Sequence, residues 1–112
     1  MIINGDNKYL LYIEPKDIRS ATPLVDELTK RMTAALRKAK AGQCFMGFQV
    51  CSCGAHSSSC DFILPSGVQT NSLCIHYLAY HRPEVPRIEL SKVLLNTTEE
   101  EAIPTEHELT GK

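Results

Sequence analysis

Hydrophobic residues recur at intervals of three and four from Pro23 to about Ala41, which is the pattern of an amphipathic helix. Thr22 is the expected N-cap, Pro23 suits the first helical position, and Gly42 can take the left-handed conformation that ends a helix. The residues expected to face the core are Val25, Leu28, Met32, Ala35, Leu36 and Ala39. This pattern predicts one long helix that covers a hydrophobic core.

Shorter apolar runs predict β-strands. The run Lys8–Glu14 is apolar and aromatic, and residues 1–4 could pair with it as a hairpin. Gly67 follows a proline and a serine between two further apolar stretches, and this turn chemistry predicts a β-hairpin over residues 61–70. The segment Gln43–Val50 alternates two sets of side chains and predicts a strand with at least one buried face. One set is Cys44, Met46, Phe48 and Val50, and the other is Phe45, Gly47 and Gln49.

Two more helices and a tail complete the predicted organisation. Residues 71–82 form a helix that ends before Pro83. The next helix is expected to start at Pro86. Its expected inward side chains are Ile88, Leu90, Val93 and Leu94. The glutamate-rich residues 96–112 have little to bury and are expected to be disordered. We therefore predict one α+β domain over residues 1–95, in which a small antiparallel sheet packs on one long helix, with a zinc-binding hairpin-helix unit at residues 51–82.

The composition is that of an ordinary small globular domain, with 43% hydrophobic and 22% charged residues in a chain of 112. Domains of this size often need a metal or a disulfide to supplement a small core. The five cysteines are an odd number, so a fully paired disulfide framework is not expected. Neither a secretory signal nor a membrane-spanning run is apparent, and we expect a cytoplasmic protein without a membrane partner.

Charge is unevenly distributed along the chain. The net charge is -1, yet residues 96–112 hold five glutamates and one lysine, or -4, which leaves +3 on the other 95 residues. Three basic residues at the end of the first predicted helix could contact nucleic acid: Arg37, Lys38 and Lys40. They also complement the negative end of the helix dipole, so a solvated helix face explains them without a nucleic acid.

Cysteine and histidine are concentrated between positions 51 and 81. Outside that window the chain has only Cys44 and His107 of these types. The seven residues of the cluster are Cys51, Cys53, His56, Cys60, Cys74, His76 and His81. Zinc favours four tetrahedral thiolate and imidazole ligands, commonly two from a short cysteine turn and two from a following helix. The cluster contains both halves of such a site.

The four first-choice ligands form two pairs. Cys51-Ser-Cys53 must turn to bring both sulfurs to one ion, and Gly54 permits that turn. His76 and His81 have the spacing of zinc-finger histidines, but in a regular helix their side chains diverge by roughly 140°. They can share a metal only if the last helical turn loosens, which Pro83 promotes.

Three further residues are substitute ligands: Cys60, Cys74 and His56. Each member of the cluster also has a reading without a metal. Free cysteine is often a small core residue, and histidine can cap a helix end or face solvent. The concentration of seven such residues in one segment favours the metal site.

The run from Leu64 to Pro86, with Leu73-Cys-Ile-His-Tyr-Leu-Ala-Tyr-His81 at its centre, resembles a stretch of small uncharacterised bacterial proteins that carry a cysteine and histidine cluster. The resemblance covers about a fifth of the chain. It implies a bacterial protein, and it implies no activity.

Three functions fit these features. A structural zinc site would stabilise a small binding or regulatory module whose partner is another protein, with candidate contacts Tyr80, Arg82 and Arg87. A metal-dependent hydrolase would keep an open zinc position and use Asp61 or Glu84 as general base. A thiol-redox protein would use Cys51 and Cys53. We predict the first function, because no sequence motif places an acid or a base beside the metal.

Overall fold

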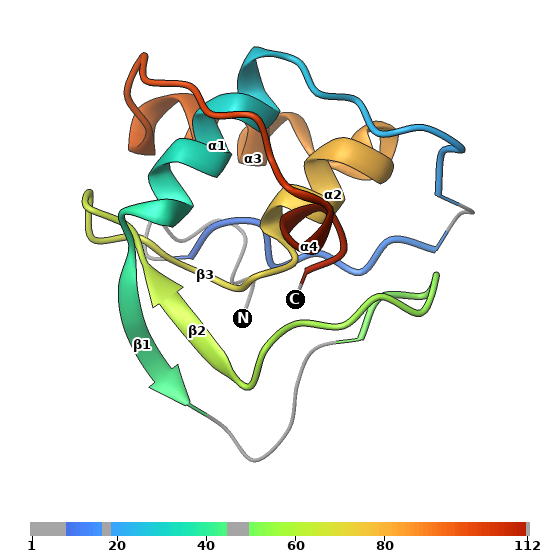
Figure 1. The fold of residues 1–112 in the computed structure, drawn as a ribbon, viewed down its shortest axis with the longest axis horizontal. Coiled ribbons are helices and arrows are strands. Elements are labelled where there is room, and N and C mark those ends of the chain that lie inside the picture. Colours follow the sequence, from blue (N-terminus) through green and yellow to red (C-terminus); the bar gives the residue numbers. More distant parts are fainter. Residues whose placement is uncertain (1–8, 17–18, 45–49, 112) are drawn as a thin grey trace.

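The computed structural model describes residues 9–16, 19–44 and 50–111, and it has an α+β fold with helices and a three-stranded antiparallel sheet in the order β1-β2-β3 (Figure 1). No helix among these residues is both long and apolar enough to cross a bilayer. The elements in chain order are α1 Glu27–Arg37, β1 Lys40–Cys44, β2 Cys60–Ile63, β3 Gln69–Thr70, α2 Cys74–Tyr80, the 3-10 turn η2 Arg82–Glu84, α3 Arg87–Asn96 and α4 Glu106–Leu109.

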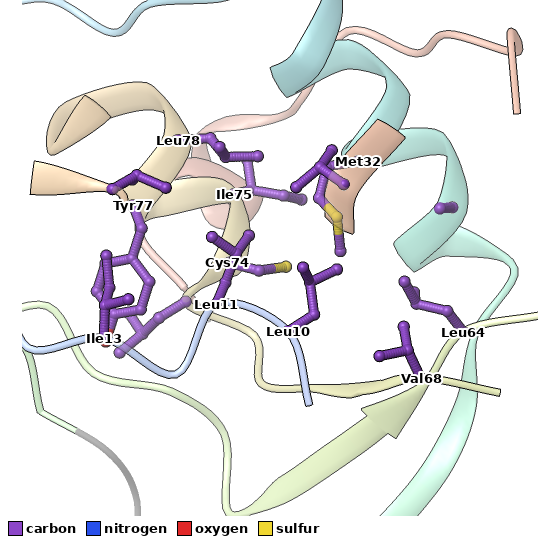
Figure 2. Packing of buried hydrophobic residues seen from close by; sticks show 14 of the residues in the cluster. Leu10, Leu11, Ile13, Met32, Leu64, Val68, Cys74, Ile75, Tyr77 and Leu78 are labelled. Atoms are coloured by element: carbon purple, nitrogen blue, oxygen red, sulfur yellow. The ribbon is translucent and has the colours of Figure 1, made fainter. Parts of the chain in front are cut away.

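The hydrophobic core surrounds α2. All nine residues from 71 to 79 are buried, so this helix contacts protein on nearly every side. Figure 2 shows Ile75 and Leu78 of α2 beside Met32 of α1, with Leu10 and Leu11 of the N-terminal segment approaching from another direction. Residues far apart in the sequence therefore meet at α2, and their burial supplies most of the apolar area of the core.

The helix predicted over residues 23–41 is shorter in the structure. It begins after Asp26, whose carboxylate accepts the Thr29 amide at 3.2 Å as the N-cap. The preceding segment is used differently: Leu24 donates its backbone amide to the Ala79 carbonyl, one of the groups left without an intrahelical partner at the end of α2. Thr22 was therefore the wrong N-cap, and the expectation of one long helix is not confirmed, because α1 has 11 residues.

The N-terminal segment is buried without forming the predicted strand. Leu10 donates its amide to the Gln69 carbonyl at 2.9 Å and accepts the Thr70 hydroxyl at 2.8 Å, but the backbone pairing with β3 is an isolated bridge and not a strand ladder. Leu11 has a φ of 58°, a left-handed conformation that interrupts the alternation of a strand. Leu10 and Leu11 are consequently both fully buried, whereas a regular strand would place them on opposite faces. The proposed hairpin with residues 1–4 lies outside the described residues.

The hairpin predicted over residues 61–70 is present. Strands β2 and β3 pair antiparallel, with Phe62 opposite Thr70, and Gly67 supplies the turn with a φ of +96°. The strand predicted over Gln43–Val50 differs. Strand β1 ends at Cys44, residues 45–49 lie outside the described residues, and Val50 is exposed.

Helix α3 starts next to Pro86 as predicted, and Leu90 and Val93 pack on the core as expected, but the other two predicted inward side chains do not. Ile88 and Leu94 are about half exposed, whereas Glu89 and Lys92 are buried as an ion pair at 3.0 Å. The Glu89 carboxylate accepts the Leu11 amide at 2.7 Å, and Lys92 donates to the Tyr9 carbonyl. The N-terminal segment is not part of a regular sheet, so its backbone amides and carbonyls need other partners. The two buried charged side chains of α3 are hydrogen-bonded to such groups.

The glutamate-rich tail folds back onto the domain, in contrast to the disorder expected from its composition. Thr105 and Glu108 form a capping box that starts α4, and α4 packs against α2. Gly111 is buried with a φ of +83°, and a side chain there would overlap Leu73. Arg37 of α1 forms two hydrogen bonds with Glu108, which attach the tail to the first helix as well.

We expect Asp26→Ala to lower the free energy of unfolding by about 1–2 kcal/mol, because it removes the N-cap of α1 and leaves Arg82 without the carboxylate it contacts at 2.6 Å. The hydrogen bond from Arg82 is the main reason that the pKa of Asp26 is lowered from 3.8 to about 2. A lowered pKa means that this stabilisation is present above pH 4 and disappears as the pH falls through 2. Chemical denaturation followed by circular dichroism at several pH values measures it.

The control for this prediction is Asp26→Asn, which keeps the capping oxygen and removes the charge. Its stability deficit should be smaller than that of the alanine variant at pH 7 and should vanish towards pH 2. An alanine variant as stable as the parent at pH 7 would contradict the role assigned to Asp26.

Candidate metal centre

A tight turn holds the two cysteines of the first pair. The Cys51 amide donates to the Ala55 carbonyl at 2.7 Å, and the Gly54 amide donates to the Cys51 carbonyl at 2.9 Å. Gly54 has a φ of +99°, which a residue with a side chain rarely adopts. The turn therefore presents Cys51 and Cys53 on one side of the loop, as the need for two convergent sulfurs predicted.

The two histidines of the second pair come together because α2 ends between them. His76 lies inside the helix, which ends at Tyr80, and His81 has a non-helical φ of -125° and ψ of 29°. The turn η2, with Pro83 inside it, follows directly. The imidazole centroids of His76 and His81 are 5.0 Å apart. In a regular helix the two histidine side chains would point in different directions. The non-helical backbone at His81, which we predicted from Pro83, brings the two rings together.

The four first-choice side chains form one compact group. Cys51 Sγ lies 3.3 Å from His81 Nε2, and Cys53 Sγ lies 3.2 Å from His76 Nε2. All four ligand atoms lie within 4.8 Å of one another. Around a tetrahedral ion with bonds of about 2.0 Å to nitrogen and 2.3 Å to sulfur, the donor atoms are roughly 3.3–3.8 Å apart. The four residues are thus close enough to hold one metal ion after small side-chain adjustments.

Oxygen acceptors lie behind both imidazoles. His76 Nδ1 is 3.0 Å from the backbone carbonyl of Leu109, the last residue of the tail helix α4, and His81 Nδ1 is 3.5 Å from Glu84 Oε2. With Nδ1 protonated towards these oxygens, each Nε2 would direct its lone pair to the side of the cysteine sulfurs, where it could bind a cation. Metal-bound histidines usually have such outer partners, which fix the tautomer and the ring orientation.

Burial favours the uncharged forms of Cys51 and His76 in the absence of a cation. Loss of hydration raises the pKa of the Cys51 thiol and lowers the pKa of His76 to about 4. Cys51, His76 and His81 are at most 3% exposed, whereas Cys53 is exposed. A divalent cation would stabilise the Cys51 thiolate in this buried position, so metal binding and loss of the thiol proton would occur together.

The three substitute ligands lie apart from this group. Cys60 forms a disulfide with Cys44, which joins β1 to β2. Cys74 is fully buried in the core, where lack of hydration raises its pKa to about 12. His56 is half-buried, with Nδ1 3.3 Å from the Ser57 carbonyl. The structure thus brings together the four first-choice residues and none of the substitutes.

The candidate general bases are hydrogen-bonded within the fold, and the predicted partner contacts differ in their exposure. The Asp61 carboxylate is buried and accepts hydrogen bonds from Tyr12 and Gln69. Glu84 lies on the outer side of the His81 imidazole and also accepts the Lys16 amide at 2.7 Å. Of the predicted partner contacts, Arg82 is paired with Asp26, Tyr80 packs on His76, and Arg87 is exposed.

Sequence reasoning missed the contribution of the tail. The Leu109 carbonyl is a backbone group, so no side chain marks its role, but the Thr105-x-x-Glu108 pattern is a helix-start signal that predicts α4. The Cys44–Cys60 pair was also missed. A pairing of two cysteines depends on the register of β1 and β2, and no short-range pattern reveals it.

No protein-family model, curated protein or solved structure matches the chain. The case for a metal centre therefore depends on the geometry of the four side chains and their outer partners.

We expect Glu84→Gln to weaken zinc binding by about ten-fold, because it removes the negative charge that supports His81 from the outer side. Competition with a chromophoric chelator at pH 7.5 measures the affinity. Glu99→Gln is the matched control, since it removes the same charge from an exposed position. Equal affinities of the two variants would contradict an outer-shell role for Glu84.

Removing the tail helix should affect the same centre through the other histidine. A chain ending at residue 104 lacks the carbonyl that faces His76 Nδ1, and we expect its zinc affinity to fall by at least ten-fold. Arg37→Gln is the comparison variant. It weakens the attachment of the tail to α1 but leaves the Leu109 carbonyl in the chain, so it separates the effect of a loosened tail from the effect of a missing carbonyl. A truncated chain that remains folded and binds zinc with the parental affinity would show that the tail does not support the centre.

Proposed function

We propose that this chain is a small zinc-binding protein whose metal stabilises the fold, and that the folded domain acts as a binding or regulatory module with a protein partner. The observation that carries the proposal is the convergence of two thiols and two imidazoles on one point. This donor set suits zinc, which accepts four sulfur and nitrogen ligands in a tetrahedron and has no redox chemistry of its own.

A structural role fits better than a catalytic one. Four protein donors would fill a tetrahedral shell and leave no position for water, which a zinc hydrolase requires. Neither Asp61 nor Glu84 is placed to activate a water, because both carboxylates accept hydrogen bonds from the protein. Each cysteine of the loop faces a histidine that lies in α2 or directly after it, so a bound ion would link the turn of Cys51 to the core.

The thiol-redox function has weaker support. Cys51 and Cys53 are free thiols, and each sulfur is within 3.3 Å of an imidazole nitrogen. Burial raises the pKa of Cys51, whereas a redox-active nucleophile needs a lowered one. The disulfide of the structure joins Cys44 to Cys60 instead, at the edge of the sheet.

Zinc content tests the proposed function directly. Untagged protein purified without added metal should carry about one zinc per chain, measured by native mass spectrometry and elemental analysis. Cys53→Ser should lower the zinc content and the thermal stability, because the ion contributes folding free energy. His56→Ala and Cys74→Ala are controls that should retain one zinc, although Cys74→Ala should lose about 1–2 kcal/mol of stability as a truncated core residue. A folded, reduced protein without metal would refute the proposal.

A further inference from the structure

The four candidate ligands differ sharply in their access to solvent. Cys51, His76 and His81 are at most 3% exposed. Cys53 is exposed and lies at the wall of a pocket of about 300 Å³. The residues that line this pocket are Arg19, Cys53, Gly54, Ala55, His56, His76 and Thr110. One side of the centre is therefore open to small molecules, and the open side carries a sulfur.

A guanidinium group is held at the same pocket. The Arg19 guanidinium carbon lies 4.6 Å from the centroid of the Tyr80 ring, which favours the cation electrostatically. The Tyr80 ring in turn packs on His76, with centroids 5.4 Å apart. The next residue, Ser20, donates its amide to the Tyr80 carbonyl at 3.0 Å, so the backbone beside Arg19 is attached to the end of α2. These contacts place a positive charge at the entrance to the exposed thiol.

Zinc bound by two thiolates and two neutral imidazoles carries no net charge, so Arg19 determines the charge of the pocket. A small anion is attracted to such a site, and a thiolate anion is also a zinc ligand. A molecule that carries both a thiol and a carboxylate can use both features, with its carboxylate beside Arg19 and its sulfur directed at the metal.

We propose that the centre exchanges its metal through Cys53, and that this pocket binds small anionic thiols that replace Cys53 as a ligand. The proposal rests on the zinc-binding function above. In the exchange step the incoming thiolate forms a sulfur–zinc bond and the bond from zinc to Cys53 breaks. Cys53 keeps the electron pair and takes a proton from water, and no oxidation or reduction occurs. The metal, held by three protein ligands and the small thiol, can then pass to an acceptor.

The test is the rate of zinc transfer from the loaded protein to an excess of a chromophoric chelator. Three small thiols of different charge are compared: thioglycolate, which is anionic, 2-mercaptoethanol, which is neutral, and cysteamine, which is cationic. The rate of each variant is divided by that of the parent protein for the same thiol, so the intrinsic reactivity of the thiols cancels. All rates are measured at low ionic strength, where the charge of Arg19 is least screened.

Arg19→Gln should slow the thioglycolate-assisted transfer about three-fold, and Arg19→Glu about ten-fold. The same variants should leave the mercaptoethanol rate within two-fold and increase the cysteamine rate. Arg87→Glu is the matched control, because it makes the same charge reversal at an exposed position on α3 and should change none of the ratios. The Arg19 variants made in a Cys44→Ser/Cys60→Ser background, and divided by the rate of that background, should give the same ratios, which separates ligand exchange from reduction of the disulfide.

Two results would overturn the inference. One is zinc release that no thiol accelerates, which would show a closed centre. The other is acceleration that depends equally on thiol charge in the parent and in Arg19→Glu, which would show that the pocket does not select anions. A protein that carries no zinc fails earlier, in the stoichiometry measurement, so failure of the proposed function is distinguishable from failure of this inference.

Discussion

The organisation of this protein depends on the burial of two imidazole rings at the end of a helix that is itself in the core. His76 and His81 are essentially inaccessible, so each ring nitrogen needs a partner inside the protein. The Nε2 atoms face the sulfurs of Cys53 and Cys51, and the Nδ1 atoms face Leu109 and Glu84. Four separate segments are positioned by these two side chains. The turn of the cysteines, the end of α2, the turn η2 and the tail helix α4 therefore have related structural roles.

The basic first helical region and the acidic tail, which are far apart in the sequence, lie side by side in the fold. Lys30, Arg37 and Lys38 of the first helical region form ion pairs with the tail residues Glu101, Glu108 and Glu100, respectively. Exposed pairs of this kind contribute little stability one at a time, but they orient the tail along α1. The Ala102 amide also donates to the Lys30 carbonyl. Two of the three basic positions that suggested nucleic-acid binding, Arg37 and Lys38, thus have intramolecular partners, and the acidic tail is a folded part of the domain.

Features that depend on local chemistry were predictable from the sequence. The hairpin at Gly67, the cysteine turn at Gly54 and the loosened helix end before Pro83 each follow from the conformational limits of glycine or proline. The start of α1 was not predictable in this way, because Leu24 bonds to α2 rather than to its own helix. The buried Glu89 was missed for a similar reason. Its partner, the Leu11 amide, is 78 positions away, and the left-handed conformation that exposes this amide has no signature in the residue type.

The disulfide and the candidate centre form overlapping loops in the chain. Cys44 and Cys60 close a loop that contains Cys51 and Cys53, and the metal would connect this loop to α2. A chain already closed by the disulfide has fewer conformations to lose when its cysteines reach the histidines, so the oxidised protein would bind an ion at a lower entropic cost. Thermodynamic linkage would make this effect reciprocal. A bound ion would in turn favour the oxidised form of the Cys44–Cys60 pair, and the thiol state of the sheet edge would then set the metal affinity.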